Sequence, residues 1–292
     1  MRFAALAFAV LGTAGIAVAE APLGKKPAYT DRELSPFPNA QAITKRIWVP
    51  GLDDGYVPQG VTFQAGVLFI SSYRSTDPKQ DRGPCRVFAV DPETGIVLSQ
   101  IDLPSQCGHA GGIARGPGGN IVVADSRHVF EIEVSGLERG KLLRVVRAAA
   151  LAGKLKGSFA AGAADGLWLG AYERSGEPKL YLIPWAKLRQ PKLSEIDTVE
   201  AVPLPLLAQG AAFDGKGDLW ITRSGSRFGE LVKLDRKTGA VLVRHAMPIG
   251  IEDISFEPGG ALWSLSEAGS RRWNAWSAFY PLALRIDVSL LR

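Results

Sequence analysis

The residues of this sequence best suited to do chemistry are two adjacent acids, Glu252 and Asp253, and one histidine, His109. Carboxylates serve as metal ligands or as general acids and bases, and histidine titrates near neutral pH. Gln59 and Gln209 share similar surroundings, each followed by a glycine and a hydrophobic stretch. We predict a small polar site to which Gln59, Gln209 and Glu252 contribute. The alternative is that these groups only satisfy backbone donors or hold water.

Arginine follows a hydrophobic segment in each of five similar stretches. Because the guanidinium group is a planar fork of donors, it suits carboxylate and phosphate groups. The sequence therefore predicts that a ring of arginines binds a polar or anionic ligand, with aromatic residues as stacking surfaces. The predicted ligand contacts are Arg74, Arg127, Arg174, Arg223 and Arg271, with Tyr73 and Trp273, and further stacking surfaces are Tyr172, Phe228 and Trp276. The alternative is a solvated basic face in which the arginines pair with acids.

Several familiar catalytic patterns are missing from the sequence. It contains no H-E-x-x-H, C-x-x-C or G-x-S-x-G motif. The three histidines, His109, His128 and His245, stand at unrelated places in the repeats, which argues against a histidine zinc site. Glycoside hydrolysis by a pair of carboxylates remains an alternative, in which Asp53 or Asp54 would act together with Glu252 or Asp253.

The elements that must position these residues come from five repeats. Each repeat has a glycine-containing first strand, a hydrophobic second strand, a third strand and usually a turn and a fourth strand. The second strands are centred on Phe69, Val122, Trp168, Trp220 and Trp263, at intervals of 43 to 53 residues. Such intervals are typical of β-propeller blades. We therefore predict an all-β, single-domain propeller of five four-stranded blades.

The ring predicted in this way closes with a strand from the other end of the chain. The last repeat stops after its third strand, at 283–288, and residues 43–50 have the pattern of the missing fourth strand. Closure by this N-terminal strand removes open sheet edges. A six-bladed ring with one degenerate blade is the alternative. In a propeller the first strands line the central channel, so the candidate residues at their starts should converge on one face.

The first residues predict export. A basic start, an Ala-rich apolar stretch and Ala17-Val18-Ala19 are typical of a secretory signal peptide at 1–19. Residues 20–42 would be an extended tail on the surface and residues 43–292 the propeller. The two cysteines, Cys85 and Cys107, predict one disulfide in an oxidising compartment. We expect a periplasmic or secreted protein without a transmembrane span.

Composition excludes some classes of protein. Hydrophobic residues make up 46% of the chain and charged residues 22%, which is ordinary for a globular domain and rules out wholesale disorder. The net charge is +5, and no run of five like charges occurs. Nucleic acid is therefore not an expected partner. We expect a monomer.

The Pro58-Gln59-Gly60 start, the Leu-Trp strands and the Asp-x-x-Thr-Gly turns resemble the bacterial propeller supergroup of NHL- and YVTN-repeat proteins. The chain also resembles, more loosely, the gluconolactonase and regucalcin-like lactonases. The resemblance covers roughly 43–292. It implies calcium on the axis, held at the starts of inner strands. Of the matching positions, Gln59, Gln209 and Glu252, only Glu252 is charged, and Asp253 stands beside it as a second ligand.

These observations predict an exported propeller that binds a small polar or anionic ligand, or an envelope protein, on its axial face. The alternative is a metal-assisted hydrolase or lactonase, in which Glu252 and Asp253 hold the cation and His109 is the general base. A third hypothesis is a structural module of the cell envelope without a small-molecule site.

Overall fold

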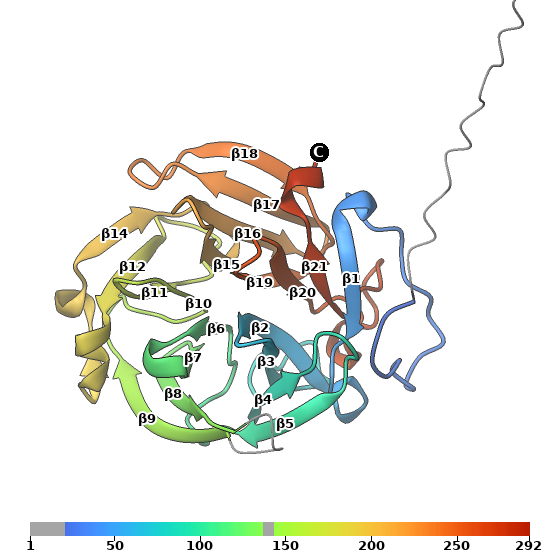
Figure 1. Ribbon diagram of the computed structural model, residues 1–292, viewed down its shortest axis with the longest axis horizontal. Coiled ribbons are helices and arrows are strands. Elements are labelled where there is room, and N and C mark those ends of the chain that lie inside the picture. The colour runs from blue at the N-terminus through green and yellow to red at the C-terminus, as the bar shows by residue number, and fades with distance from the viewer. Residues whose placement is uncertain (1–20, 137–142) are drawn as a thin grey trace, which may run out of the picture.

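Five antiparallel sheets are arranged as blades around a central axis (Figure 1). The computed structural model describes residues 21–136 and 143–292. Four of the sheets have four strands, and the remaining one, the second blade along the chain, carries an additional short strand at its outer edge. The prediction of a five-bladed propeller is confirmed, and the six-bladed alternative is wrong. The signal peptide predicted at 1–19 lies outside the described residues.

Each blade runs from an inner strand at the axis to an outer strand at the rim. The first comprises β2 (Tyr56–Gln64), β3 (Val67–Arg74), β4 (Cys85–Val90) and β5 (Val97–Asp102). The second comprises β6 (Gly112–Arg115), β7 (Ile121–Asp125), β8 (His128–Val134), β9 (Leu143–Leu151) and the short β13 (Lys192–Leu193), which lies parallel to β9. The third comprises β10 (Phe159–Gly162), β11 (Gly166–Gly170), β12 (Lys179–Pro184) and β14 (Glu200–Pro203).

The remaining two blades complete the ring. The fourth comprises β15 (Ala208–Phe213), β16 (Leu219–Gly225), β17 (Phe228–Leu234) and β18 (Val241–Ala246). The fifth comprises β19 (Ile251–Phe256), β20 (Leu262–Ser266), β21 (Leu282–Ile286) and β1 (Ile43–Trp48). The helices among the described residues are short 3-10 turns, and none of them has the length and hydrophobicity needed to cross a bilayer.

The ring closes as the sequence predicts. β1 pairs antiparallel with β21, with Ile47 opposite Ala283 and Trp48 opposite Leu282. Figure 1 shows the N-terminal strand in blue beside the red C-terminal strand. Because residues from both ends of the chain form one sheet, the fifth blade links the termini and leaves the ring without a gap.

Hydrophobic side chains fill the spaces between blades. One buried cluster joins Val57 and Phe69 of the first blade to Ile113 and Phe130 of the second. Burying one such side chain contributes about 1.5–3 kcal/mol. The outer strands are more exposed, and β18 presents the exposed apolar side chains of Val241, Leu242 and Val243.

The hairpins between third and fourth strands use the turn residues identified in the sequence. Asp91 Oδ1 accepts from the Glu93 backbone N–H at 2.9 Å, and Asp91 Oδ2 accepts from the Thr94 hydroxyl at 2.8 Å. Gly95 follows with φ +74°, a conformation that favours glycine. The Asp-x-x-Thr-Gly pattern therefore makes a tight turn by local hydrogen bonding.

At the axis the inner strands approach one another closely. A Cβ on Gly60 would lie 2.8 Å from the backbone nitrogen of Ile113, and one on Gly210 would lie 2.6 Å from the Asp253 Cα. Both contacts are too short for a real side chain. The glycines that follow Gln59 and Gln209 are therefore needed for the packing of neighbouring inner strands.

Asp253 lies among these strands and is fully buried. Its Oδ2 accepts from the backbone N–H of Ile113 in β6 at 2.9 Å. The backbone amides of Val61 in β2, Ala211 in β15 and Ile254 in β19 also act to lower the pKa of the carboxyl group. The hydrogen bond to Ile113 connects the inner strands of the second and fifth blades.

We predict that Asp253→Ala lowers the free energy of unfolding by about 2 kcal/mol, because the buried Ile113 amide loses its acceptor. Denaturant unfolding of residues 20–292 measures this loss. The exposed Asp54 provides the control, and Asp54→Ala should leave stability nearly unchanged. Equal unfolding midpoints for the two variants would contradict the assigned role of Asp253.

Candidate functional site

β-bulges interrupt three inner strands where the sequence places polar residues. The residues left out of the antiparallel register are Gln59 in β2, Gln209 in β15, and Glu252 with Asp253 in β19. A bulged residue has no direct partner across the ladder, and bulges commonly re-aim side chains at functional sites. The bulges here allow Gln59, Gln209 and Glu252 to face the axis at the same level.

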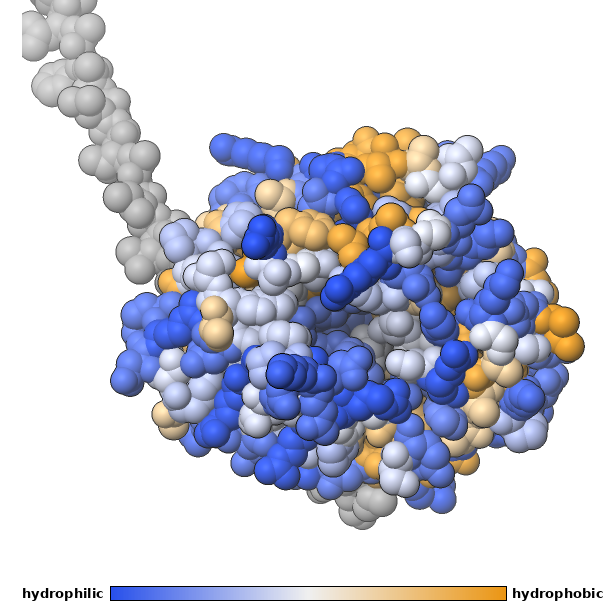
Figure 2. Space-filling model, turned by 180° about the vertical axis from the view of Figure 1, so that it is seen from behind, coloured by the Kyte–Doolittle hydropathy of each residue, from blue (hydrophilic) through white to orange (hydrophobic). Residues whose placement is uncertain are grey.

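A cavity of about 460 Å³ opens on the axis beside these bulges. Its volume lies in the range of small-molecule sites. Of the predicted site residues, six line it: Gln59, His109, Arg174, Gln209, Glu252 and Trp273. Figure 2 shows one face of the ring, with a hollow near its centre and mostly hydrophilic residues around it.

Two glutamate carboxyl groups are the most deeply buried acids on the cavity wall. Glu252, in β19, is 2% exposed, and its Oε1 accepts from Gln209 Nε2 at 3.0 Å. Glu267, which follows β20, is 9% exposed, and its Oε2 accepts from Gln59 Nε2 at 3.1 Å and from Trp273 Nε1 at 2.7 Å. Each glutamine thus orients one glutamate that belongs to the fifth blade.

Burial changes the protonation of both glutamates. Desolvation raises the pKa of Glu252 well above its usual range, and the negative charges of Glu267 and Asp253 add to this rise. Desolvation also raises the pKa of Glu267, to about 7, against the hydrogen bonds from Trp273 and Gln59. Glu252 therefore holds a proton more tightly than an ordinary glutamate does, and at a pH of about 7 Glu267 is poised between its two forms.

Asp253 differs from its neighbour Glu252 in where it points. Its carboxyl group is directed at the backbone amides between the blades and does not line the cavity. Burial raises the pKa of Asp253, and the surrounding amides act against that rise. The structure therefore pairs Glu252 with Glu267 on the cavity wall, and it gives Asp253 a contact inside the ring.

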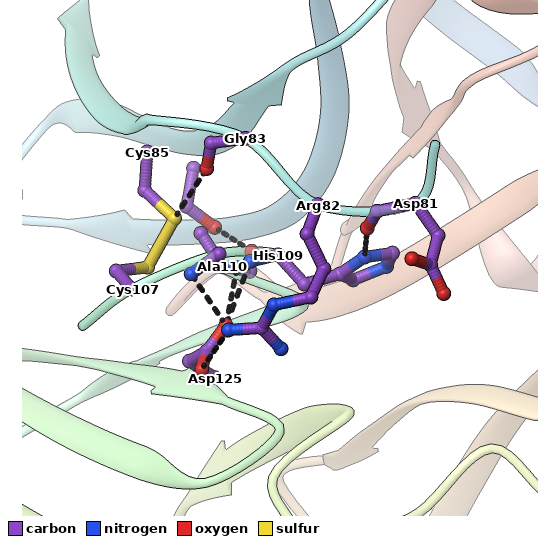
Figure 3. The surroundings of a disulfide bond; sticks show 10 residues. Asp81, Arg82, Gly83, Cys85, Cys107, His109, Ala110 and Asp125 are labelled. Atoms are coloured by element: carbon purple, nitrogen blue, oxygen red, sulfur yellow. Dashed lines mark hydrogen bonds and ion pairs between the residues drawn. A yellow bond between two sulfur atoms is a disulfide. The ribbon is translucent and has the colours of Figure 1, made fainter. Parts of the chain in front are cut away.

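His109 is held on the wall by a constrained loop (Figure 3). The disulfide between Cys85 and Cys107 ties this loop to β4, as the sequence predicts. The His109 Nδ1 hydrogen-bonds to the Asp81 backbone oxygen at 2.6 Å, and the ring stacks on Tyr73 at 4.5 Å. Burial lowers the pKa of His109, so the imidazole is neutral at neutral pH.

A buried aspartate completes the support of this loop. The Asp125 Oδ1 accepts from the backbone N–H of Gly108 at 3.1 Å and from that of His109 at 2.7 Å. Arg82 lies 3.7 Å from Asp125 Oδ2 (Figure 3). The disulfide and Asp125 together fix the backbone from which His109 reaches the cavity.

The predicted arginine ring is not assembled around the cavity. Arg174 is exposed at the rim, and its guanidinium lies 5.8 Å from the centre of the Tyr172 ring. The other four arginines make contacts elsewhere. Arg74 donates to the Asp54 backbone oxygen, Arg127 to that of Gly153, Arg223 to Leu206 and Glu230, and Arg271 lies over the Tyr29 ring.

Tyr73 also lies outside the cavity wall, and its neighbours explain why. It is fully buried, and its hydroxyl accepts from Arg272, which is itself 7% exposed. Arg272 donates as well to the backbone oxygens of Asp77 and Pro78 at 3.2 and 3.1 Å. Burial lowers the pKa of Arg272 to about 10. The cation is therefore held by neutral oxygens, while the ring of Tyr73 supports His109.

Glu267, Arg272 and Asp81 line the cavity without being among the site residues predicted from the sequence, whereas Trp276 lines it beside Trp273, and both were expected as stacking surfaces. Trp273 and Trp276 stack with their ring centres 4.8 Å apart. All but Asp81 follow the second strand of the fifth blade. This is the position from which the arginines were selected. Attention to acids at that position, as well as arginines, would have found Glu267.

A second hollow, of about 530 Å³, lies between the N-terminal segment and the first blade. Its lining combines backbone, apolar side chains and a few polar residues, among them Asp53. Asp53 already accepts from the Ala28 backbone N–H at 2.7 Å and pairs with Lys25 at 3.2 Å. Among the residues that the structure describes, this hollow lacks a convergent set of buried polar side chains like the one that lines the axial cavity.

The donor set of the axial cavity does not match calcium. Calcium takes six to eight oxygen ligands. The cavity wall carries the buried carboxyl groups of Glu252 and Glu267 and the exposed Asp81, and both glutamine amides direct their nitrogens at the two glutamates. Within 21–136 and 143–292, the one group of three metal-ligating side chains is Cys85, Cys107 and Asp125, whose sulfurs form the disulfide. We therefore derive no reaction step through a metal.

These features define the chain as a five-bladed β-propeller with a small-molecule-sized cavity on its axis. No protein-family model matches the chain, and no curated protein matches it in sequence. Among solved structures, it is similar to the glutaminyl cyclase of Myxococcus xanthus, with a TM-score of 0.53 and 14% identity. That match covers 80% of this chain and 90% of the other. At this identity the likeness shows the fold alone.

Two further solved propellers are similar at lower TM-scores. One is a gluconolactonase from Xanthomonas campestris, with a TM-score of 0.44 and 16% identity over 90% of this chain and 99% of the other. Another is a luciferin-regenerating enzyme, with a TM-score of 0.47 and 11% identity over 81% and 92%. Function must therefore be argued from the site.

The N-terminal segment holds the loop that carries Glu267 and the tryptophan pair. Tyr29 donates to the Gly269 backbone oxygen, and Arg32 Nη1 donates to that of Asn274 at 2.5 Å. Farther along, the Tyr280 hydroxyl donates to the Pro36 backbone oxygen at 2.6 Å. These contacts clamp residues 267–280 from both ends, so the segment before the propeller helps to shape the cavity wall.

We predict that the double variant Tyr29→Phe and Arg32→Ala weakens the exciton coupling between Trp273 and Trp276, because their loop loses two anchors. The couplet in the circular dichroism spectrum measures this, and a Trp276→Phe variant identifies the signal. Lys26→Ala is the control, since Lys26 pairs with the exposed Glu33 and not with the loop. A couplet unchanged in the double variant would contradict the clamping role.

Proposed function

We propose that this chain is an exported propeller that binds a small polar molecule in its axial cavity. The observation that carries the proposal is the convergence, in one cavity of about 460 Å³, of buried hydrogen-bonding groups and a stacked aromatic pair. Specific small-molecule sites combine these two elements. The leader-like residues 1–19 and the Cys85–Cys107 disulfide support export.

The polar character of the ligand follows from the cavity wall. Glu252 and Glu267 are acceptors when ionised and donors when protonated, so they favour a molecule with matching hydrogen-bonding groups. An anion would meet one exposed guanidinium, Arg174, and three acids. The geometry therefore supports a polar ligand better than a purely anionic one.

A concave site also favours a small molecule over a protein partner. Protein interfaces of standard size bury about 800 Å² on each side and are built around packed apolar or aromatic anchors. Here the buried polar groups lie inside a cavity, where the side chains of a flat partner would not reach them. An envelope protein on the same face is the competing outcome of the experiment below.

Proton-transfer catalysis is a second candidate function, and the pKa of Glu267, about 7, favours it. A general acid or base works best when its pKa lies near the working pH. Glu267 would exchange a proton with the bound molecule, and the neutral His109 would accept a hydrogen bond or a proton on the opposite side. The substrates to assay are a lactone and a glutaminyl peptide. They are chosen because solved structures similar to this chain include a gluconolactonase and a glutaminyl cyclase.

The proposed binding function predicts a thermal stabilisation. We expect one class among sugars, sugar acids, lactones, phosphates and amines to raise the melting temperature of residues 20–292. A ligand at 100 times its dissociation constant adds about 2.7 kcal/mol to the stability of the folded state. We expect calcium and EDTA to cause no shift, because the donor set of the cavity does not fit calcium.

Two variants locate the stabilising ligand. Glu252→Gln should abolish the shift, because it alters a group on the cavity wall. Arg127→Ala should retain it, because Arg127 contacts Gly153 outside the cavity. If no compound shifts the melting temperature, or if Arg127→Ala removes the shift and Glu252→Gln does not, the axial cavity is not the binding site.

A further inference from the structure

Glu252 and Glu267 each keep one carboxyl oxygen for a ligand. One oxygen of each group is engaged, by Gln209 in the first case and by Gln59 and Trp273 in the second. Glu252 Oε2 and Glu267 Oε1 accept no hydrogen bond from the described residues, and neither is sealed off from the cavity. Two side chains that are more than nine-tenths buried thus direct unpartnered acceptors into one cavity.

No positive charge compensates these acids. Within the described part of the chain, neither glutamate forms an ion pair, and no cation is among the causes that shift the pKa of either. Arg272, the nearest buried cation on the wall, donates to Tyr73 and to two backbone oxygens instead. An uncompensated buried carboxylate is costly unless a proton or a cation neutralises it.

The aromatic pair offers a second feature that suits a cation. Trp273 and Trp276 line the same cavity as the two glutamates, and Trp273 is hydrogen-bonded directly to Glu267. The faces of tryptophan attract cations, and a flat apolar group can stack on them. An ammonium group near Glu267 would therefore lie beside an aromatic surface.

We propose that the ligand of the axial cavity is a small organic molecule carrying a protonated primary amine next to a flat apolar group. The N–H donors of the ammonium would fill Glu252 Oε2 and Glu267 Oε1, and the apolar group would pack on Trp273 and Trp276. This inference rests on the proposed binding function and specifies its ligand class. It replaces the anion expected from the arginines by a cation.

Proton release should accompany the binding of such a cation. The titratable groups around the cavity are Asp81, His109, Tyr172, Arg174, Glu252, Glu267 and Arg272, with Asp253 beneath them. Below a pH of about 7 Glu267 is protonated, and it must lose its proton to pair with an ammonium ion. Affinity should therefore rise as the pH increases through 7, until the amine itself loses its charge.

Four aromatic compounds of similar size test the proposal by calorimetry on the mature chain. Benzylammonium should bind at least tenfold more tightly than benzyl alcohol, which is neutral, and than benzoate, which is an anion. It should also bind more tightly than benzyltrimethylammonium, which keeps the charge and lacks N–H donors. In buffers of different ionisation enthalpy, the heats should show net proton release at pH 7.

Matched substitutions locate the effect. Glu267→Gln should weaken benzylammonium binding at least tenfold and remove the proton release. Glu177→Gln is the control, because Glu177 is exposed outside the axial cavity. If Glu267→Gln fails to fold, Trp276→Leu serves instead, and it should weaken binding of the benzyl cation while its proton release persists.

Failure of the ammonium proposal differs from failure of the binding function. If benzyl alcohol, benzoate or a sugar binds in a way that depends on Glu252 while benzylammonium binds no better, the cavity is a ligand site and the ammonium class is wrong. If no compound of any class binds, the proposed function fails and the ammonium proposal fails with it. Equal binding to the Glu267→Gln and Glu177→Gln variants would overturn the assigned contact.

Discussion

Three carboxyl groups, those of Glu252, Asp253 and Glu267, are buried around the axis of the ring, and none forms an ion pair within the part of the chain that the structure describes. Taking an ionised carboxyl group out of water is unfavourable unless hydrogen bonds, protons or cations compensate. Each of the three is compensated in a different way. Asp253 accepts from the Ile113 backbone amide, and burial raises the pKa of Glu252 well above its usual range. Glu267 accepts from Trp273 and Gln59, and its pKa is raised to about 7.

The fold creates this situation and also makes it tolerable. Inner strands from several blades meet at the axis, where glycines let them approach and bulges release one or two residues from the ladder. The released side chains must then face the channel. Because Asp253 accepts from the Ile113 amide of another blade, it links two inner strands, while Glu252 beside it lines the cavity. Two adjacent acids therefore have different tasks.

Much of the architecture could be predicted from the sequence. Regular spacing of the Leu-Trp strands indicated the blades, and the strand-like residues 43–50 indicated the closure, because both follow from local hydrophobic patterns. Gln59, Gln209 and Glu252 were found because they recur at one position of the repeat. The same periodic argument selected arginines that turn away from the axis. Side-chain direction after a second strand depends on loops of unequal length, which the repeat does not encode.

The loop at 267–280 illustrates what sequence alone could not supply. Glu267 and Trp276 reach the cavity because Tyr29, Arg32 and Pro36, far away in the chain, hold that loop in place. Contacts between segments some 240 residues apart leave no local pattern. The position of His109 likewise depends on the disulfide and on Asp125, which come together only in the folded ring.

The central claim is that the axial glutamates are carboxyl groups without a counter-charge, and infrared titration tests it most directly. Difference spectra between residues 20–292 and their Glu267→Gln variant isolate the C=O band of one protonated acid. We predict that this band disappears at a pH of about 7, and that the band isolated with Glu252→Gln persists well above the ordinary glutamate range. Ionisation of both groups near the ordinary glutamate pKa of about 4.3 would contradict it.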